Sequence, residues 1–257
     1  MNLLLLEPHE LGPDDVVVLA DTRARHLQAV LAVVPNDNVR IGIVDGAVGT
    51  ATVLSSDRES GHVTLRCHVD GLPPPMPRVD LLLAVPRPKV LRRLWPQLAA
   101  LGVGRIVLTN AARVERNYFD THLLAADIYR PLLIEGLQQA RDTRVPEVSV
   151  HRQFRILVED HLDQIVGRTT RLVADPGASV RVADAVRPAV EQSGRVLLAV
   201  GPEGGWNRFE IDLLSAHGFR PVTMGARTLR SDTACIALLA LVHDALAGST
   251  PSTITSS

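Results

Sequence analysis

The chain has 257 residues, a formal net charge of −1 and an apolar fraction of 46%, with only 3% aromatic residues. Its two cysteines, Cys67 and Cys235, exclude a disulfide framework and a cysteine-based zinc site. The longest apolar run near the C-terminus, residues 234–242, is far too short to span a membrane, and the N-terminus lacks a basic signal-peptide region. We therefore expect a soluble, cytoplasmic protein with no membrane segment and no bound metal.

Charge is distributed unevenly along the chain. Residues 1–77 carry 5 basic and 10 acidic side chains, residues 78–155 carry 13 and 7, and residues 156–257 carry 9 and 11. A polyanion would therefore be attracted mainly to the middle segment. Because 26 of the 27 basic residues are arginine, a bias that a GC-rich genome also produces, arginine content alone does not indicate RNA binding.

The first part of the chain predicts a small β-rich region with one helix. Short apolar segments of strand character are found at residues 16–19, 38–44, 47–54 and 62–69. Asp45-Gly46 is a typical hairpin turn between two of these strands. A helix is expected over residues 21–34, with Asp21 or Thr22 as N-cap and Pro35 at its end.

A proline-rich linker separates this region from the remainder. Residues 71–78 contain four prolines and can form neither a helix nor a central strand. We therefore assign residues 1–72 to an N-terminal domain and residues 73–248 to a second domain. The Ser/Thr-rich residues 249–257 are expected to be a disordered tail.

Strands and helices alternate after the linker. Strands are expected at residues 79–85, 105–109, 171–174, 196–200 and 221–224. Helices are expected at residues 89–101, 125–140, 154–166, from about 207, and after 231. A repeated strand–helix pattern predicts an α/β domain with a parallel sheet covered on both faces.

The Gly-Pro-Glu-Gly-Gly segment, residues 201–205, follows the expected strand 196–200 and precedes a helix. Glycines at this position let backbone approach a ligand closely. The simplest interpretation is an ordinary glycine-rich turn. The segment lacks the Lys-Ser/Thr ending of a phosphate-binding P-loop and the spacing of a dinucleotide fingerprint. The remaining functional interpretation is a site in which main-chain groups hold a ligand at the carboxyl end of a strand.

A second such loop is Met-Gly-Ala-Arg-Thr-Leu-Arg-Ser-Asp-Thr-Ala, residues 224–234, which opens the last apolar helix. The alternative to a ligand site here is a helix-start turn with surface arginines. Together the two loops resemble the cofactor-binding motifs of the SPOUT methyltransferases, specifically the RsmE family of 16S rRNA (uracil-N3)-methyltransferases. Ala226, Thr228 and Asp232 replace the Pro, Ile/Val and Glu that are usual in that family.

The resemblance implies a SPOUT α/β-knot domain, with a C-terminal trefoil knot, behind a PUA-like β-barrel domain. It also implies a homodimer that acts on 16S rRNA of the small ribosomal subunit, with S-adenosyl-L-methionine as cofactor. By this resemblance, the residues at the family's cofactor-binding positions are Val173, Val200, Gly201, Pro202, Glu203, Gly204, Gly205, Met224, Gly225, Thr228, Leu229 and Arg230.

Methylation of uracil N3 requires loss of the N3 proton and stabilisation of the charge that spreads onto the neighbouring oxygens. By the resemblance, Arg230 and Arg227 are expected near the uracil or the cofactor carboxylate, and Glu203 is expected to orient the glycine loop. The sequence does not identify the general base.

The expected RNA contacts come from three further segments that resemble the family. The first is residues 86–119, which begin with Pro-Arg-Pro-Lys and end with Arg-Val-Glu-Arg-Asn-Tyr-Phe. The second is residues 135–148, which contain Gln-Ala-Arg-Asp-Thr, and the third is a helical Arg-x-x-His stretch in residues 22–31. Each has a plainer interpretation as a solvated basic face or a helix end. The assigned residues are Arg23, Arg25, His26, Arg87, Lys89, Arg92, Arg113, Arg116, Arg141 and Arg144.

Two other functions stay open. A SPOUT ribose 2′-O-methyltransferase acting on tRNA or rRNA would share both glycine loops. A non-catalytic RNA-binding protein that keeps the knot would retain the same fold. The N-terminal domain and the 139–143 segment favour the uracil-N3 enzyme over the first of these.

Overall fold

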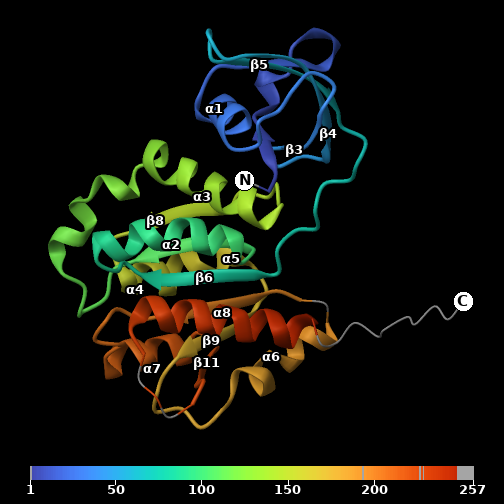
Figure 1. Ribbon diagram of the computed structural model, residues 1–257. Coiled ribbons are helices and arrows are strands. Elements are labelled where there is room, and N and C mark those ends of the chain that lie inside the picture. The colour runs from blue at the N-terminus through green and yellow to red at the C-terminus, as the bar shows by residue number, and fades with distance from the viewer. Residues whose placement is uncertain (1, 193, 226, 228, 248–257) are drawn as a thin grey trace, which may run out of the picture. The chain divides into compact units, whose positions relative to one another are not determined.

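The computed structural model describes residues 2–192, 194–225, 227 and 229–247 (Figure 1). The chain forms two compact units: Met1–Met76 with Leu133–Val145, and Pro77–Leu132 with Pro146–Ser257. Within the described ranges, no helix combines the length and apolar character that crossing a membrane requires. The tail predicted at 249–257 lies outside the described residues.

The first unit is built on a five-stranded mixed sheet in the order β1-β3-β4-β5-β2. Only β1 and β3 pair in parallel; the other neighbours are antiparallel. The strands are β1 (Leu4–Leu6), β2 (Val16–Leu19), β3 (Asn38–Ile43), β4 (Val48–Asp57) and β5 (His62–His68). The four predicted strands and the turn at Asp45-Gly46 are confirmed, whereas β1 was not predicted.

One α-helix, α1 (Thr22–Ala29), completes the core of this unit. Asp21 is its N-cap as predicted, and Ala24 and Leu27 are buried against the inward face of the sheet. The predicted end at residue 34 is wrong. The helix stops at Val30 because Ala32 adopts a left-handed conformation, with φ of 50°, which breaks the helical hydrogen-bond pattern.

The second unit contains a six-stranded, fully parallel sheet in the order β11-β9-β10-β6-β7-β8, which confirms the predicted parallel α/β architecture. All five residues of β10 are buried, as expected for a central strand covered on both faces. The strands are β6 (Val79–Ala84), β7 (Val103–Thr109), β8 (Glu147–His151), β9 (Thr170–Ala174), β10 (Val196–Val200) and β11 (Phe219–Val222).

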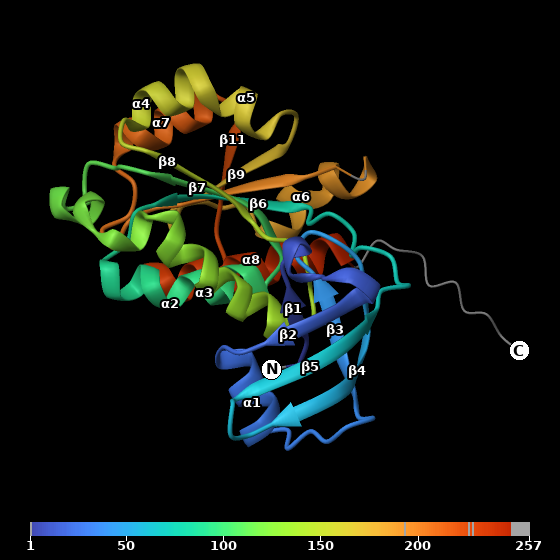
Figure 2. The same ribbon diagram turned by 90° about the horizontal axis from the view of Figure 1, so that it is seen from above.

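Helices cover both faces of this sheet. Helices α2, α6 and α8 lie on one face, and α4, α5 and α7 lie on the other (Figure 2). The helices are α2 (Pro88–Ala100), α3 (Ala126–Ala140), α4 (Phe154–Ile156), α5 (Leu162–Val166), α6 (Val182–Glu191), α7 (Arg208–Ala216) and α8 (Ser231–Ala247), with a π-helical turn at Leu157–His161 between α4 and α5.

The sequence missed β8 and α6 and displaced one strand. The strand predicted at 221–224 is β11, which starts two residues earlier, directly after Gly218 with φ of 82°, and ends at Val222. The residues that follow Val222 therefore belong to a loop, which lines the same cavity as the glycine segment 201–205 after β10.

Candidate cofactor site

A cavity of about 270 Å³ lies in the second unit at the carboxyl ends of β9, β10 and β11. Ligands of parallel α/β sheets bind at this edge, where loops leave the strands. Three groups of residues line it: those at the end of β9, the loop after β10, and the loop after β11 with the start of α8. Apolar side chains such as Val200, Val222 and Leu238 form much of its wall.

The loop after β10 places backbone at the cavity. The Gly205 amide donates to the Pro202 carbonyl at 2.8 Å, which closes a tight turn, and Gly205 has φ of 69°. A Cβ atom on Gly204 would lie 2.8 Å from Cδ of Arg113. The positive φ therefore favours glycine at 205, and a side chain at 204 would require the Arg113 side chain to move.

The loop after β11 forms the opposite wall. Gly225 has φ of 132°, a conformation that side chains rarely adopt, and the Thr223 hydroxyl donates to the Gly225 carbonyl at 3.2 Å. Arg227 and Leu229 line the cavity and are exposed. Ala226 and Thr228, two of the departures from the family pattern, lie outside the described residues.

Glu210 is a buried carboxylate that the sequence interpretation missed. It accepts hydrogen bonds from the Asn207 amide and from the Ala112 amide, both at 2.7 Å, and it is 3% exposed. The first bond completes a capping box at the start of α7, a pattern readable from the Asn-x-x-Glu spacing. The second joins the loop after β7 to the first turn of α7, just beyond the loop after β10, and no local pattern predicts it.

Two arginines reinforce the same junction. The Arg113 guanidinium donates to the Gly204 carbonyl. The Arg87 amide donates to Glu203 Oε1 at 3.3 Å, and Arg87 Nε lies 3.9 Å from the same oxygen. Glu203, which lines the cavity, is thus held by a residue that follows β6, and its role as an orienting group for the loop stays a prediction.

A tyrosine and a glutamate lie on the segment that follows β7. The Tyr118 hydroxyl donates to Glu115 Oε1 at 2.9 Å. Burial, together with this hydrogen bond, raises the pKa of the Tyr118 phenol above its ordinary value.

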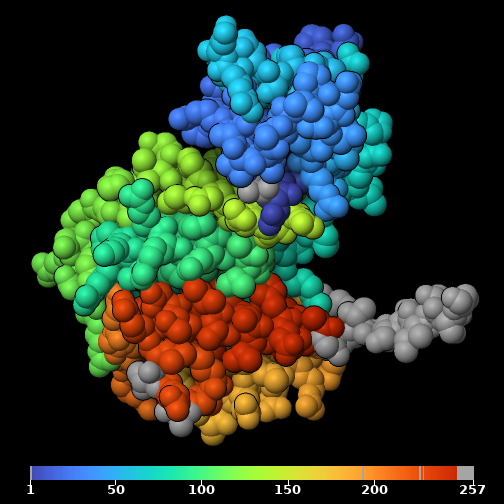
Figure 3. All heavy atoms as spheres, viewed as in Figure 1, coloured from blue at the N-terminus to red at the C-terminus, as the bar shows by residue number. Residues whose placement is uncertain are grey.

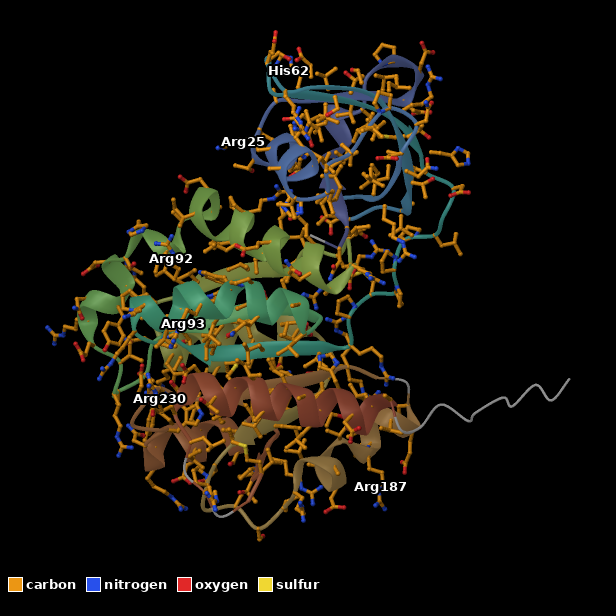
Figure 4. All side chains as sticks on the ribbon, viewed as in Figure 1. Arg25, His62, Arg92, Arg93, Arg187 and Arg230 are labelled. Atoms are coloured by element: carbon orange, nitrogen blue, oxygen red, sulfur yellow. The ribbon has the colours of Figure 1, made fainter. Side chains whose placement is uncertain are left out.

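Asp232 connects two arginines at the start of α8. Its Oδ2 accepts from Arg93 Nη2 at 2.9 Å, and its Oδ1 lies 3.8 Å from Arg230 Nε. Figure 4 shows Arg93 on α2 and Arg230 before α8 on the same side of the second unit. Arg230 is exposed and outside the cavity lining, so its guanidinium is available to a ligand at the surface.

Trp206 combines burial with an unpaired donor. It lines the cavity and is 8% exposed, and its indole Nε1 has no hydrogen-bond partner among the described residues. Its ring packs against Phe154 with centroids 5.3 Å apart. A buried donor without an acceptor costs about 1–3 kcal/mol, so this nitrogen requires an explanation.

The cavity gathers most of the predicted cofactor residues. Those that line it are Val200, Gly201, Pro202, Glu203, Gly204, Gly205, Met224, Gly225 and Leu229. Val173 is fully buried inside β9, one residue before the lining, and Arg230 lies beyond it. Thr228 is outside the described residues. No group of three or more His, Cys, Asp or Glu side chains is arranged to hold a metal within the described part of the chain.

The predicted RNA contacts divide between the two units. Five belong to the second unit, and all five are exposed: Arg87, Lys89, Arg92, Arg113 and Arg116. The other five, Arg23, Arg25, His26, Arg141 and Arg144, belong to the first unit.

Two of the first-unit arginines are occupied by internal contacts. The Arg23 guanidinium pairs with Glu10 and Asp21 and donates to the Leu5 carbonyl at 3.0 Å. Arg144 donates to the carbonyls of Pro74 and Asp45 at 2.9 and 3.0 Å. These contacts give both residues a structural role, and their RNA contacts stay predictions.

Comparison with known proteins identifies the family to which the chain belongs. Residues 73–243 match the family described as RNA methyltransferase domain. The chain is 32% identical over 247 residues to the ribosomal RNA small subunit methyltransferase E of Treponema pallidum, covering 94% of this chain and 90% of that protein. A Borreliella burgdorferi protein named ribosomal RNA small subunit methyltransferase E 1 is 24% identical over 92% of this chain and 95% of its own length.

A solved structure agrees with these relatives. The crystal structure of a ribosomal RNA small subunit methyltransferase E from Neisseria gonorrhoeae, bound to S-adenosyl methionine, superposes with a TM-score of 0.75 at 25% identity. The match covers 95% of this chain and 97% of that one. The chain therefore belongs to the RNA methyltransferase family, among the ribosomal RNA small subunit methyltransferases E.

Proposed function

We propose that this protein transfers a methyl group from S-adenosyl-L-methionine to a uracil N3 of 16S rRNA in the cytoplasm. The observation that carries the proposal is the cavity formed by two glycine loops at the carboxyl ends of β9, β10 and β11, in a chain of this family. The Neisseria gonorrhoeae relative, which shares the fold over nearly its whole length, was solved with this cofactor bound.

The cavity suits the proposed cofactor in shape and chemistry. Backbone at Gly204 and Gly205 approaches without side chains, so main-chain groups can contact a nucleoside directly. The apolar wall at Val200, Val222 and Leu238 can cover a purine. Trp206 adds a buried donor that lacks an acceptor of its own.

The chain's own residues would do the positioning and charge stabilisation. The bound cofactor supplies an electrophilic methyl group. Arg227, at the cavity, and Arg230, beside it, can stabilise the negative charge that the uracil ring acquires when N3 loses its proton. Glu203, held by Arg87, keeps the glycine loop in position. Aligning the two reactants in one site supplies much of the remaining acceleration.

The exposed arginines of the second unit support an RNA substrate. Arg87, Arg92, Arg113 and Arg116 lie on segments that begin at the carboxyl ends of β6 and β7, the same sheet edge as the cavity. Guanidinium groups make forked hydrogen bonds to phosphates, and such contacts give affinity without sequence preference.

The finer features of the family belong to the same proposal: a PUA-like barrel at residues 1–72, a trefoil knot in residues 73–248, and a homodimer. Figure 3 shows α8 as a broad exposed band on one face of the second unit. Its exposed side includes Ala240 and Leu241, with Leu241 41% exposed, and a second copy could cover it. Light scattering on the wild type and on Leu241→Asp tests this, because a dimer formed through α8 should dissociate in the variant.

Methyl transfer to small ribosomal subunits that lack the modification tests the reaction. Labelled cofactor should be incorporated, and primer extension should stop at one uridine, because an N3-methyl group blocks base pairing. Label without a stop would indicate ribose methylation, and no label would favour an RNA-binding protein without activity. Arg230→Ala should abolish turnover with an unchanged melting temperature, since the exposed side chain contributes little to stability.

A further inference from the structure

Trp206 lines the cavity, yet its indole N–H has no hydrogen-bond partner among the residues that the structure describes. The residue follows the glycine loop directly and lines the cavity. It is one of two tryptophans in the chain. The other, Trp95, is fully buried and donates its indole N–H to the Leu123 carbonyl at 3.2 Å. The two indoles therefore differ in one respect that matters here, which is the presence of an acceptor.

The surroundings of the Trp206 ring fix its place. Phe154 packs against it at 5.3 Å with the planes inclined by 30°. A Cβ atom built on Gly201 would lie 3.2 Å from the indole Nε1 and Cδ1 atoms. The polar edge of the ring thus lies directly against the first residue of the glycine loop, and a side chain at 201 would require the two to move apart.

We infer that the Trp206 indole N–H is a hydrogen-bond donor to the nucleoside part of the ligand bound in this cavity, an inference that rests on the proposed function. The nitrogen is covered in the structure, so the glycine loop must shift slightly for the contact to form. Gly204 and Gly205, on the same loop, provide that freedom because neither carries a Cβ atom.

The chemistry of the neighbours selects the nucleoside over the amino-acid part. Charged side chains of the lining, including Glu203 and Arg227, are exposed at the rim, where a zwitterionic group would remain hydrated and paired. Trp206 is buried against an aromatic ring and a glycine and offers one neutral donor. A neutral acceptor, either a ring nitrogen of the base or a ribose hydroxyl, matches that environment.

Nuclear magnetic resonance of the ¹⁵N-labelled full chain tests the contact. Only two indole N–H signals exist, and Trp206→Phe assigns them by removing one. Adding S-adenosylhomocysteine, which cannot transfer a methyl group, should move the Trp206 signal downfield. The Trp95 signal is an internal control and should stay in place, because its donor is already paired. Adenosine alone should produce the same shift.

Calorimetry supplies the second measurement. Trp206→Phe removes the donor and should weaken S-adenosylhomocysteine binding roughly fivefold to tenfold, the usual effect of losing one neutral hydrogen bond. An unmoved Trp206 signal at saturation, or an unchanged Kd in a folded variant, would overturn the inference and leave the proposed function intact. A shift with S-adenosylhomocysteine but not with bound adenosine would overturn the assignment to the nucleoside. Absence of S-adenosylhomocysteine binding to the wild type would instead overturn the proposed function and this inference with it.

Discussion

Replacing Glu210 by Gln should weaken the link between the loop after β7 and the first turn of α7, which directly follows the glycine loop. The carboxylate accepts from two backbone amides at 2.7 Å, and a glutamine can satisfy only one of them while turning an amide donor toward the other. Loss of one hydrogen bond to a buried charged group costs about 1.5–3 kcal/mol. For a chain of this size that corresponds to a melting temperature lower by roughly 3–12 °C.

Thermal melting and calorimetric cofactor affinity measure the two consequences of Glu210→Gln. The matched variant is Asn207→Ala, which removes the side-chain cap of α7, worth about 1 kcal/mol. It leaves in place the hydrogen bond that the Ala112 amide donates to Glu210. We expect both variants to be destabilised and only Glu210→Gln to bind cofactor more weakly. Equal affinities in the two variants would refute the view that the link between the loops organises the site.

Other contacts lead to further predictions. Asp232→Asn should lower kcat roughly tenfold, because the carboxylate that connects Arg93 and Arg230 is lost. Cofactor affinity and melting temperature should stay nearly unchanged. Asp232→Glu should restore kcat, and Asp244→Asn on the same helix is the control. Arg23→Gln should cost about 2 kcal/mol at neutral pH, because the contacts with Glu10 are lost, whereas Arg25→Gln, at an exposed position, should leave stability nearly unchanged and weaken RNA binding. The hydrogen bond from Arg23 lowers the pKa of Glu10 in the folded protein. The pair therefore stabilises the fold fully above the usual carboxyl pKa, and this stabilisation is lost as the pH falls through the pKa of Glu10 in the folded state. The stability gap between the wild type and Arg23→Gln, measured by urea titration, should therefore narrow as the pH falls below the usual carboxyl pKa of 4.5 and close at still lower pH.

Local patterns predicted the elements that carry the site. The Gly-Pro-Glu-Gly-Gly segment lies between β10 and α7 as expected, and Asn207 starts α7 with a capping box. The missed elements have weaker local signals. Helix α6 contains Pro188 and has no side-chain cap, and β8 is a half-buried edge strand without a continuous apolar run. Propensity alone could not favour either over a loop.

The remaining parts of the site depend on contacts between distant residues. Glu210 and Ala112 are 98 positions apart, and Arg93 and Asp232 are 139 apart. Arg23 illustrates the opposite problem. It belongs to the helical basic pattern from which RNA contacts were predicted, and Glu10, 13 positions upstream, pairs with it. Whether a surface arginine is available to a ligand is decided by such partners, and local sequence does not contain them.

The hydrogen bond between the Ala112 amide and Glu210 also bears on ligand affinity. In the sheet, β6 lies between β7 and β10, so the link from Ala112 to Glu210 crosses the end of an intervening strand. Arg87 follows that strand and holds Glu203, so the loops after three adjacent strands are joined by side-chain contacts to backbone amides. These contacts restrict the movement of the three loops, so ligand binding has to supply less ordering entropy. Affinity should therefore depend on these internal contacts as strongly as on the residues that touch the ligand.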